Sequence, residues 1–215
     1  AAPGFINAGP YPGFTRGEYI DKSVVREKFI RSCQYMLENQ VPVWVGEFGP
    51  VYSGVPEEDE MRYRLLEDQI AIYAEFDANW SLWTYKDLGL QGVVSLLPNT
   101  PWMKKMQPVL EKKALLGVDS WGGSDRNVRN LLDPLEQAFS ELFPNYNPFP
   151  FNAHWQIHRV VRNILLAEPL VENIYPLLAG LDMEEIDELM RSFLFENCCP
   201  RQRLCQIIRK EKPAA

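Results

Sequence analysis

The chain has 215 residues, of which 46 % are hydrophobic and 24 % are charged, a balance that is typical of a globular protein with a sizeable core. Its formal net charge of −7 disfavours nucleic-acid partners, because proteins that bind such polyanions need clustered Lys and Arg to displace counterions. The sequence contains no stretch of about 18 apolar residues, so we expect no membrane-spanning segment. The composition therefore favours a neutral or small-molecule partner.

The cysteines and the first residue of the sequence bear on the cellular location of the protein. The chain has four cysteines, whose spacing resembles no zinc or redox motif. This pattern favours free thiols and an intracellular location, but a signal peptide could have preceded Ala1, so localisation stays open. Because the sequence starts with Ala1 rather than Met, we expect a processed or excised piece of a longer chain.

The predicted elements of the first part of the chain alternate between helix and strand. Apolar residues at helical spacing predict an amphipathic helix over 21–39, with Asp21 as its N-cap. The apolar run 41–45 predicts a strand buried on both faces, a second helix follows the acidic start at 57–60, and 80–83 predicts a second strand. This order predicts parallel strands joined by crossover helices, and hence an α/β fold.

The composition changes after residues 121–124, beyond which every periodic segment is helical. We therefore predict one domain over 1–122 and an α-helical C-terminal extension over 123–215. Within the extension, Asp182–Glu185 has the pattern of a capping box that opens an acidic helix. We interpret the Lys and Arg residues of the C-terminal tail as solvated surface.

Two histidines share one face of a predicted helix in the extension. His154 and His158 have i,i+4 spacing, which can hold a metal ion. However, no carboxylate or Cys lies at a suggestive spacing from them in the sequence. We therefore interpret the pair as structural and predict neither a metal site nor a cofactor.

Polar and aromatic residues follow the two predicted strands. If the two strands belong to a parallel barrel, their C-terminal ends face one active-site mouth. Glycoside hydrolysis with retention needs a carboxylate there that attacks the anomeric carbon of a sugar, a role that Glu47 could fill. The indole of Trp83 could stack on the sugar ring. Tyr52 and Lys86 also follow strand ends and could contact sugar hydroxyls. Taken without their neighbours, Glu47 is better explained by an ion pair or helix cap and Trp83 by core packing, and solvated loops explain the other two at least as well.

The residues around these positions resemble a known family. Val41–Gly49, with the sequence Val-Pro-Val-Trp-Val-Gly-Glu-Phe-Gly, resembles the seventh-strand signature of glycoside hydrolase family five, the cellulase-like retaining hydrolases. Trp80–Asp87 resembles the eighth strand of the same family. Trp83–Gly92 and Ser192–Cys198 resemble a fungal branch of it. The resemblance implies a (β/α)₈ TIM barrel of which residues 1–122 supply only the last strands and helices.

The resemblance also implies a function. Glu47 would be the catalytic nucleophile, Trp83 would line the subsite where cleavage occurs, and the substrate would be a β-linked polysaccharide or glycoside. In that family the acid/base Glu follows an Asn on the fourth strand, and no Asn-Glu pair precedes Glu47 here. We therefore expect this piece alone to be inactive, with an upstream barrel segment or self-association covering its exposed edges. The alternative is a non-catalytic remnant that binds carbohydrate or a protein partner.

Overall fold

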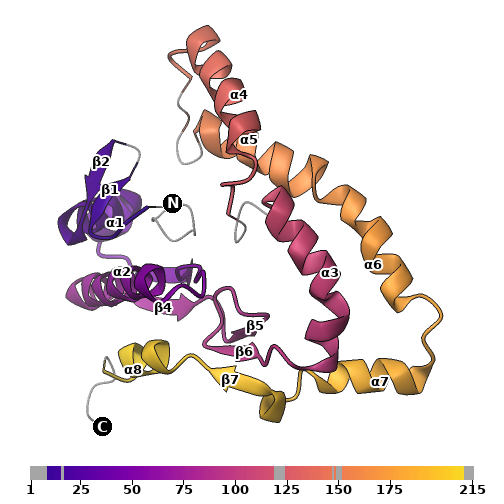
Figure 1. The fold of residues 1–215 in the computed structure, drawn as a ribbon. Coiled ribbons are helices and arrows are strands. Elements are labelled where there is room, and N and C mark those ends of the chain that lie inside the picture. The colour runs from indigo at the N-terminus through magenta and orange to yellow at the C-terminus, as the bar shows by residue number, and fades with distance from the viewer. Residues whose placement is uncertain (1–8, 16, 119–123, 147, 149–151, 211–215) are drawn as a thin grey trace. The chain divides into compact units, whose positions relative to one another are not determined.

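The computed structural model describes residues 9–15, 17–118, 124–146, 148 and 152–210. These residues form two compact units, and the first of them is discontinuous in sequence. The strand unit contains the described residues up to Ser95 together with those from Cys199 onward, and the helical unit runs from Leu96 to Cys198. Figure 1 labels the elements of both units.

Short sheets and three main helices make up the strand unit. Its elements, with the two strands β6 and β7 that reach the helical unit, are β1 (Gly13–Thr15), β2 (Glu18–Ile20), α1 (Lys22–Glu38), β3 (Trp44–Phe48), α2 (Pro56–Glu75), β4 (Asn79–Leu82), β5 (Lys86–Asp87), β6 (Val94–Leu96), β7 (Cys198–Pro200) and α8 (Gln202–Lys210). β1 pairs with β2 antiparallel, β3 with β4 parallel, and β5 with β6 parallel in a sheet of order β5-β6-β7. The parallel crossover β3-α2-β4 is the arrangement that the alternating pattern predicts.

Local sequence explains where these elements begin. The Asp21 side chain accepts hydrogen bonds from the backbone N–H groups of Ser23 at 2.9 Å and Val24 at 3.1 Å, which confirms the predicted N-cap of α1. α2 starts at Pro56, which is tolerated there because the N–H groups of the first turn have no partner within the helix. The first turn of α2 is also acidic, which stabilises the N-terminus of a helix. β3 begins three residues later than predicted, after Pro42, which has no N–H to donate to a neighbouring strand.

The register of the central strand pair is irregular. Trp44 pairs with Asn79 and Val45 with Trp80, but the next pairing is Phe48 with Leu82, so a bulge lies between Val45 and Phe48. The described strands form small sheets rather than a closed barrel. The partial-barrel fold for residues 1–122 therefore stays a prediction.

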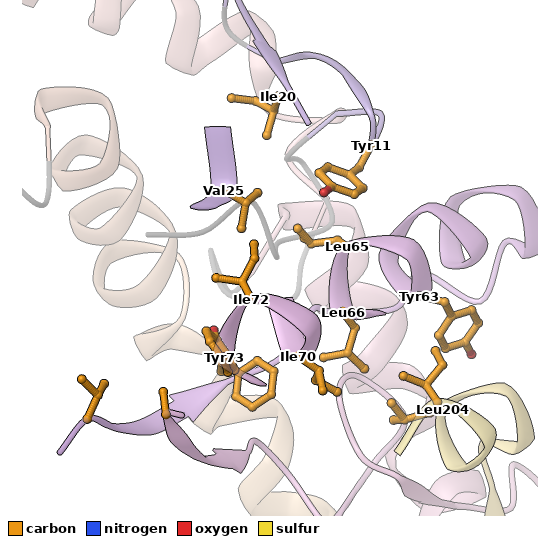
Figure 2. Close-up of a cluster of buried hydrophobic side chains, with 14 of the residues drawn as sticks. Tyr11, Ile20, Val25, Tyr63, Leu65, Leu66, Ile70, Ile72, Tyr73 and Leu204 are labelled. Carbon is orange, nitrogen blue, oxygen red and sulfur yellow. The ribbon is translucent and has the colours of Figure 1, made fainter. Parts of the chain in front are cut away.

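One hydrophobic core holds the strand unit together. Leu65, Leu66 and Ile72 of α2 are completely buried at its centre, and side chains from the N-terminal hairpin and α1 pack around them, as Figure 2 shows. The C-terminal helix α8 also contributes Leu204 and Ile207, of which at most 1 % is exposed. The interpretation of the tail Lys and Arg as solvated surface holds for Arg209 and Lys210, which are exposed, but Arg201 is only partly exposed. The apolar residues between them make the tail a short amphipathic helix that closes this core.

Helices dominate the second unit. Its elements are α3 (Pro101–Leu116), α4 (Arg129–Leu142), α5 (Ala153–Val160), a π-helical turn (Val161–Leu165), a 3₁₀ turn (Glu168–Leu170), α6 (Val171–Leu178), α7 (Met183–Arg191) and a second 3₁₀ turn (Phe195–Asn197). α3 contacts α6 and α7, and α4 contacts α5. The Asp182 and Glu185 side chains form the predicted capping box of α7. Among the described helices, no single one is long and apolar enough to cross a membrane, and the segments 153–178 and 183–191 pass that criterion only as a pair bent by 115°.

The helical unit is an insertion between β6 and β7. Its two ends meet, because the Leu97 N–H donates to the Asn197 carbonyl at 2.9 Å. Just inside the strand unit, the Arg201 N–H donates to the Val93 carbonyl at 2.8 Å. The two compact units therefore do not coincide with the predicted ranges 1–122 and 123–215, whose common boundary lies outside the described residues.

Candidate functional site

Glu47 and Trp83 lie at the same edge of the β3–β4 sheet. Glu47 is exposed and stands one residue before the end of β3, rather than just beyond the strand as predicted. Trp83 directly follows β4, its N–H donates to the Phe48 carbonyl at 2.8 Å, and its side chain is 50 % exposed. Since β3 and β4 are parallel, their C-terminal ends bring the carboxylate and the indole to one edge.

Strand alternation directs the Glu47 carboxylate away from the core. The next residue, Phe48, is buried and packs edge-on against Tyr73 at 4.9 Å and Trp80 at 5.4 Å between ring centroids. Successive side chains on a strand point to opposite faces, so Glu47 faces solvent. Among the described residues, no hydrogen bond or salt bridge engages its carboxylate. The group is therefore accessible to a ligand, as a nucleophile must be.

Glycine is required where the two strand ends touch. Gly49 has φ +148°, and a Cβ at this position would lie 2.5 Å from the carbonyl oxygen of Trp83. The loop after β4 folds back on this point, because Gln91 Nε2 donates to the Gly49 carbonyl at 3.0 Å. Asp87 shapes that loop by accepting hydrogen bonds from the N–H groups of Gly89 and Gln91.

Tyr52 and Lys86, the other two predicted sugar-contacting residues, lie in less open surroundings. Tyr52 is 2 % exposed, its ring centroid lies 5.0 Å from that of Tyr63, and the Arg201 guanidinium lies 4.2 Å above it. Burial raises the pKa of the Tyr52 hydroxyl well above its ordinary range. Lys86 lies in β5 and is half-buried. Because a core side chain cannot reach a sugar, Tyr52 is not part of the candidate surface.

Arg201 is a residue of this region that the sequence pattern did not single out. Its side chain donates to the Gly89 carbonyl at 2.9 Å and to the Gly92 carbonyl at 3.3 Å, both in the loop that follows Trp83. A basic residue near the C-terminus has no local signal that distinguishes such a position from solvated surface. Only the fold brings Arg201 beside a loop more than 100 residues earlier in the chain.

A second cluster of titratable groups lies in the helical unit. Glu136 on α4 accepts a hydrogen bond from His158 at 2.8 Å and makes a closer contact with His154, both on α5. Burial lowers the pKa of His158. At Glu136, burial acts to raise the pKa of the carboxyl group, but the hydrogen bonds from the two histidines outweigh it, so this pKa is lowered. The spacing of residues along the sequence did not identify this carboxylate as a partner of the two histidines. The feature that could have identified Glu136 is its position one helical turn after the buried Leu132, on the packed side of α4.

Comparison with known proteins adds a relative of named activity. No family model matches the chain. The chain is 35 % identical over 206 residues to a protein named beta-xylosidase from Phanerodontia chrysosporium. The chain resembles a glycosidase. The match covers 88 % of this chain and 43 % of the relative, so the chain spans less than half of that protein's length. The match therefore supports a glycoside hydrolase in general terms.

Proposed function

We propose that the chain is the nucleophile-bearing part of a retaining glycoside hydrolase of the family-five type. Glu47 would attack the anomeric carbon to form a glycosyl-enzyme, and Trp83 would stack on the sugar that is cleaved. The observation that carries this proposal is an accessible carboxylate and a half-exposed indole at the same edge of two parallel strands. The similarity to a protein named beta-xylosidase supports it independently of geometry.

The substrate follows from the same comparison. We propose a β-linked xyloside as the first substrate to test, among the β-linked glycosides and polysaccharides that the resemblance implies. No Asn-Glu pair precedes Glu47 in the sequence, so the proton donor would come from further barrel strands outside this chain. Those strands, or a second copy of the chain, would also cover the open edges of the β3–β4 sheet.

The missing acid/base dictates the experiment. A leaving group such as 2,4-dinitrophenolate departs without protonation, so a carboxylate nucleophile can react even when no acid assists it. We expect 2,4-dinitrophenyl 2-deoxy-2-fluoro-β-xyloside to label this chain covalently, because the fluorine slows hydrolysis of the glycosyl-enzyme. Peptide mass spectrometry should place one fluoroxylosyl group on Glu47. Glu47→Gln should abolish labelling, and Glu60→Gln, which changes an acidic residue of α2, should not.

Binding without hydrolysis is the second candidate function, and the half-exposed indole of Trp83 at the sheet edge favours it. A carbohydrate-binding remnant would need Trp83 but would make no use of Glu47 as a nucleophile. It predicts that xylo-oligosaccharides bind to the chain and to Glu47→Gln equally well, that Trp83→Ala weakens this binding, and that the fluorinated reagent labels neither protein. Absence of label on a folded chain that binds xylo-oligosaccharide would decide for this second function.

A further inference from the structure

Two helices of the helical unit bring two imidazoles and a carboxylate together. His154 and His158 stand one turn apart on α5, with ring centroids 4.2 Å apart, and both contact the carboxylate of Glu136 on α4. One ligand atom from each of the three lies within 4.8 Å of the other two. Two nitrogen donors and one carboxylate oxygen are a ligand set that zinc and similar divalent cations prefer.

A buried carboxylate stands behind this cluster. Asp125 is 6 % exposed, and its Oδ2 atom lies 3.9 Å from Nδ1 of His158. Oδ2 pairs with Arg129 at 2.6 Å without hydrogen-bond geometry, and among the described residues it accepts no hydrogen bond. Metal-bound histidines commonly donate their second ring N–H to a carboxylate, which fixes the ring for coordination. Asp125 becomes that acceptor if the imidazole or the carboxylate moves to close this 3.9 Å gap to hydrogen-bond distance.

The position of Arg162 defines the metal-free arrangement. Its Nη1 donates to Nδ1 of His158 at 3.0 Å, and a guanidinium has no lone pair to accept in return. Nδ1 therefore carries no proton when the imidazole is neutral, and the proton on Nε2 donates to Glu136. A cation at Nε2 requires this proton to leave Nε2 and Nδ1 to be protonated instead. Arg162 would then give up this contact and keep its 2.6 Å hydrogen bond to the Gly117 carbonyl.

We propose that Glu136, His154 and His158 bind a divalent cation, with zinc as the best-fitting ion, and that Asp125 orients His158 for it. In the bound state Nδ1–H of His158 donates to Asp125, and water completes the coordination of the ion. The local charges permit this, because Asp125 and Glu136 offset the guanidinium groups of Arg129 and Arg162. The bound ion would cross-link α4 to α5. This site does not depend on the glycosidase proposal.

Zinc titration of the chain tests the proposal. Calorimetry and thermal unfolding should show one zinc ion bound per chain, an unfolding temperature that rises with zinc, and its return on adding a chelator. The chain has only two histidines, so imidazole nuclear magnetic resonance signals can be assigned directly, and both should shift on binding. His158→Gln should lose zinc binding, and Asp125→Asn should weaken it about 10- to 100-fold.

The four cysteines require a control, because thiolates also bind zinc. Cobalt should give a visible spectrum without the thiolate charge-transfer band, and Cys198→Ser with Cys199→Ser should bind zinc with unchanged affinity. The proposal is overturned if the wild-type imidazole signals do not move with zinc, or if cobalt shows thiolate ligation. Unchanged zinc affinity in His158→Gln would overturn it as well. Because the imidazole signals are read in the wild-type chain, the test does not depend on the variants folding.

Discussion

The backbone of Gly49 lies directly against the carbonyl of Trp83, so closely that a Cβ on Gly49 would stand 2.5 Å from that oxygen. The neighbouring hydrogen bond from the Trp83 N–H to the Phe48 carbonyl holds the same two strand ends together. The position of the indole relative to Glu47 therefore depends on a residue that carries no side chain.

Gly49→Ala should disrupt this contact. A side chain at φ +148° costs about 1–3 kcal/mol, and the clash with the carbonyl adds about as much, so we expect the free energy of unfolding to fall by about 2–6 kcal/mol. Gly46→Ala is the matched control, because its Cβ would meet only the Trp44 side chain at 3.8 Å. Chemical denaturation of both variants measures the difference, and equal stability would contradict the close approach.

Arg201→Met should loosen the loop that follows Trp83. The substitution keeps most of the apolar stem but removes the hydrogen bonds to Gly89 and Gly92 and the contact with the Tyr52 ring. We expect a loss of about 2–4 kcal/mol of stability, since hydrogen bonds from a partly buried charged group are among the stronger ones. Arg209→Met, at an exposed position of α8, should change stability by less than about 0.5 kcal/mol. Urea denaturation measures both variants, and indistinguishable midpoints would argue against the role of Arg201.

Leu204→Ala should show that the C-terminal helix belongs to the core of the strand unit. Leu204 is completely buried, and removing such a side chain costs about 2–5 kcal/mol through lost burial and a residual cavity. Gln206→Ala lies on the exposed face of the same helix and should be nearly neutral. Thermal unfolding monitored by circular dichroism compares the two substitutions. A harmless Leu204→Ala would mean that α8 does not close this core.

Buried tyrosines should make the strand unit sensitive to alkaline pH. Burial raises the pKa values of Tyr11, Tyr52 and Tyr73 above the ordinary value of 10.0, with the hydrogen bond to Asp68 adding to the effect at Tyr11. The unfolded chain releases these protons near pH 10, whereas the folded chain retains them. Stability is therefore fully present below pH 10 and falls as the pH rises above it.

Tyr52→Phe isolates one of these contributions. Among the described residues its hydroxyl has no hydrogen-bond partner, so the variant should be at least as stable as the wild type at neutral pH. Above pH 10 it should lose stability less steeply than the wild type. Tyr35→Phe, at a position that is 70 % exposed, is the control and should leave the slope unchanged. Urea denaturation on either side of pH 10 gives both slopes, and parallel slopes for all three proteins would refute the assignment to Tyr52.

Local patterns predicted the parts of the structure that depend on neighbouring residues. The Asp21 cap, the β3-α2-β4 crossover and the Asp182 capping box follow from side-chain periodicity and short hydrogen bonds within a few residues. The same reading missed Arg201 and Glu136, because their partners lie far away in sequence and are chosen by packing. Tyr52 was predicted to contact sugar because it follows a strand in the sequence. In the structure its ring is buried and packs against Tyr63 and the Arg201 guanidinium.

The insertion of the helical unit between β6 and β7 has a consequence for synthesis of the chain. The backbone hydrogen bond from Arg201 to Val93, and the burial of Leu204 and Ile207, join segments separated by roughly half the polypeptide. During synthesis, the strand ends that carry Glu47 and Trp83 would therefore leave the ribosome long before α8, the helix that closes the core of the strand unit. The region proposed to hold the nucleophile would reach its final packing only after α8 has been synthesised, with the intervening helices already free to fold.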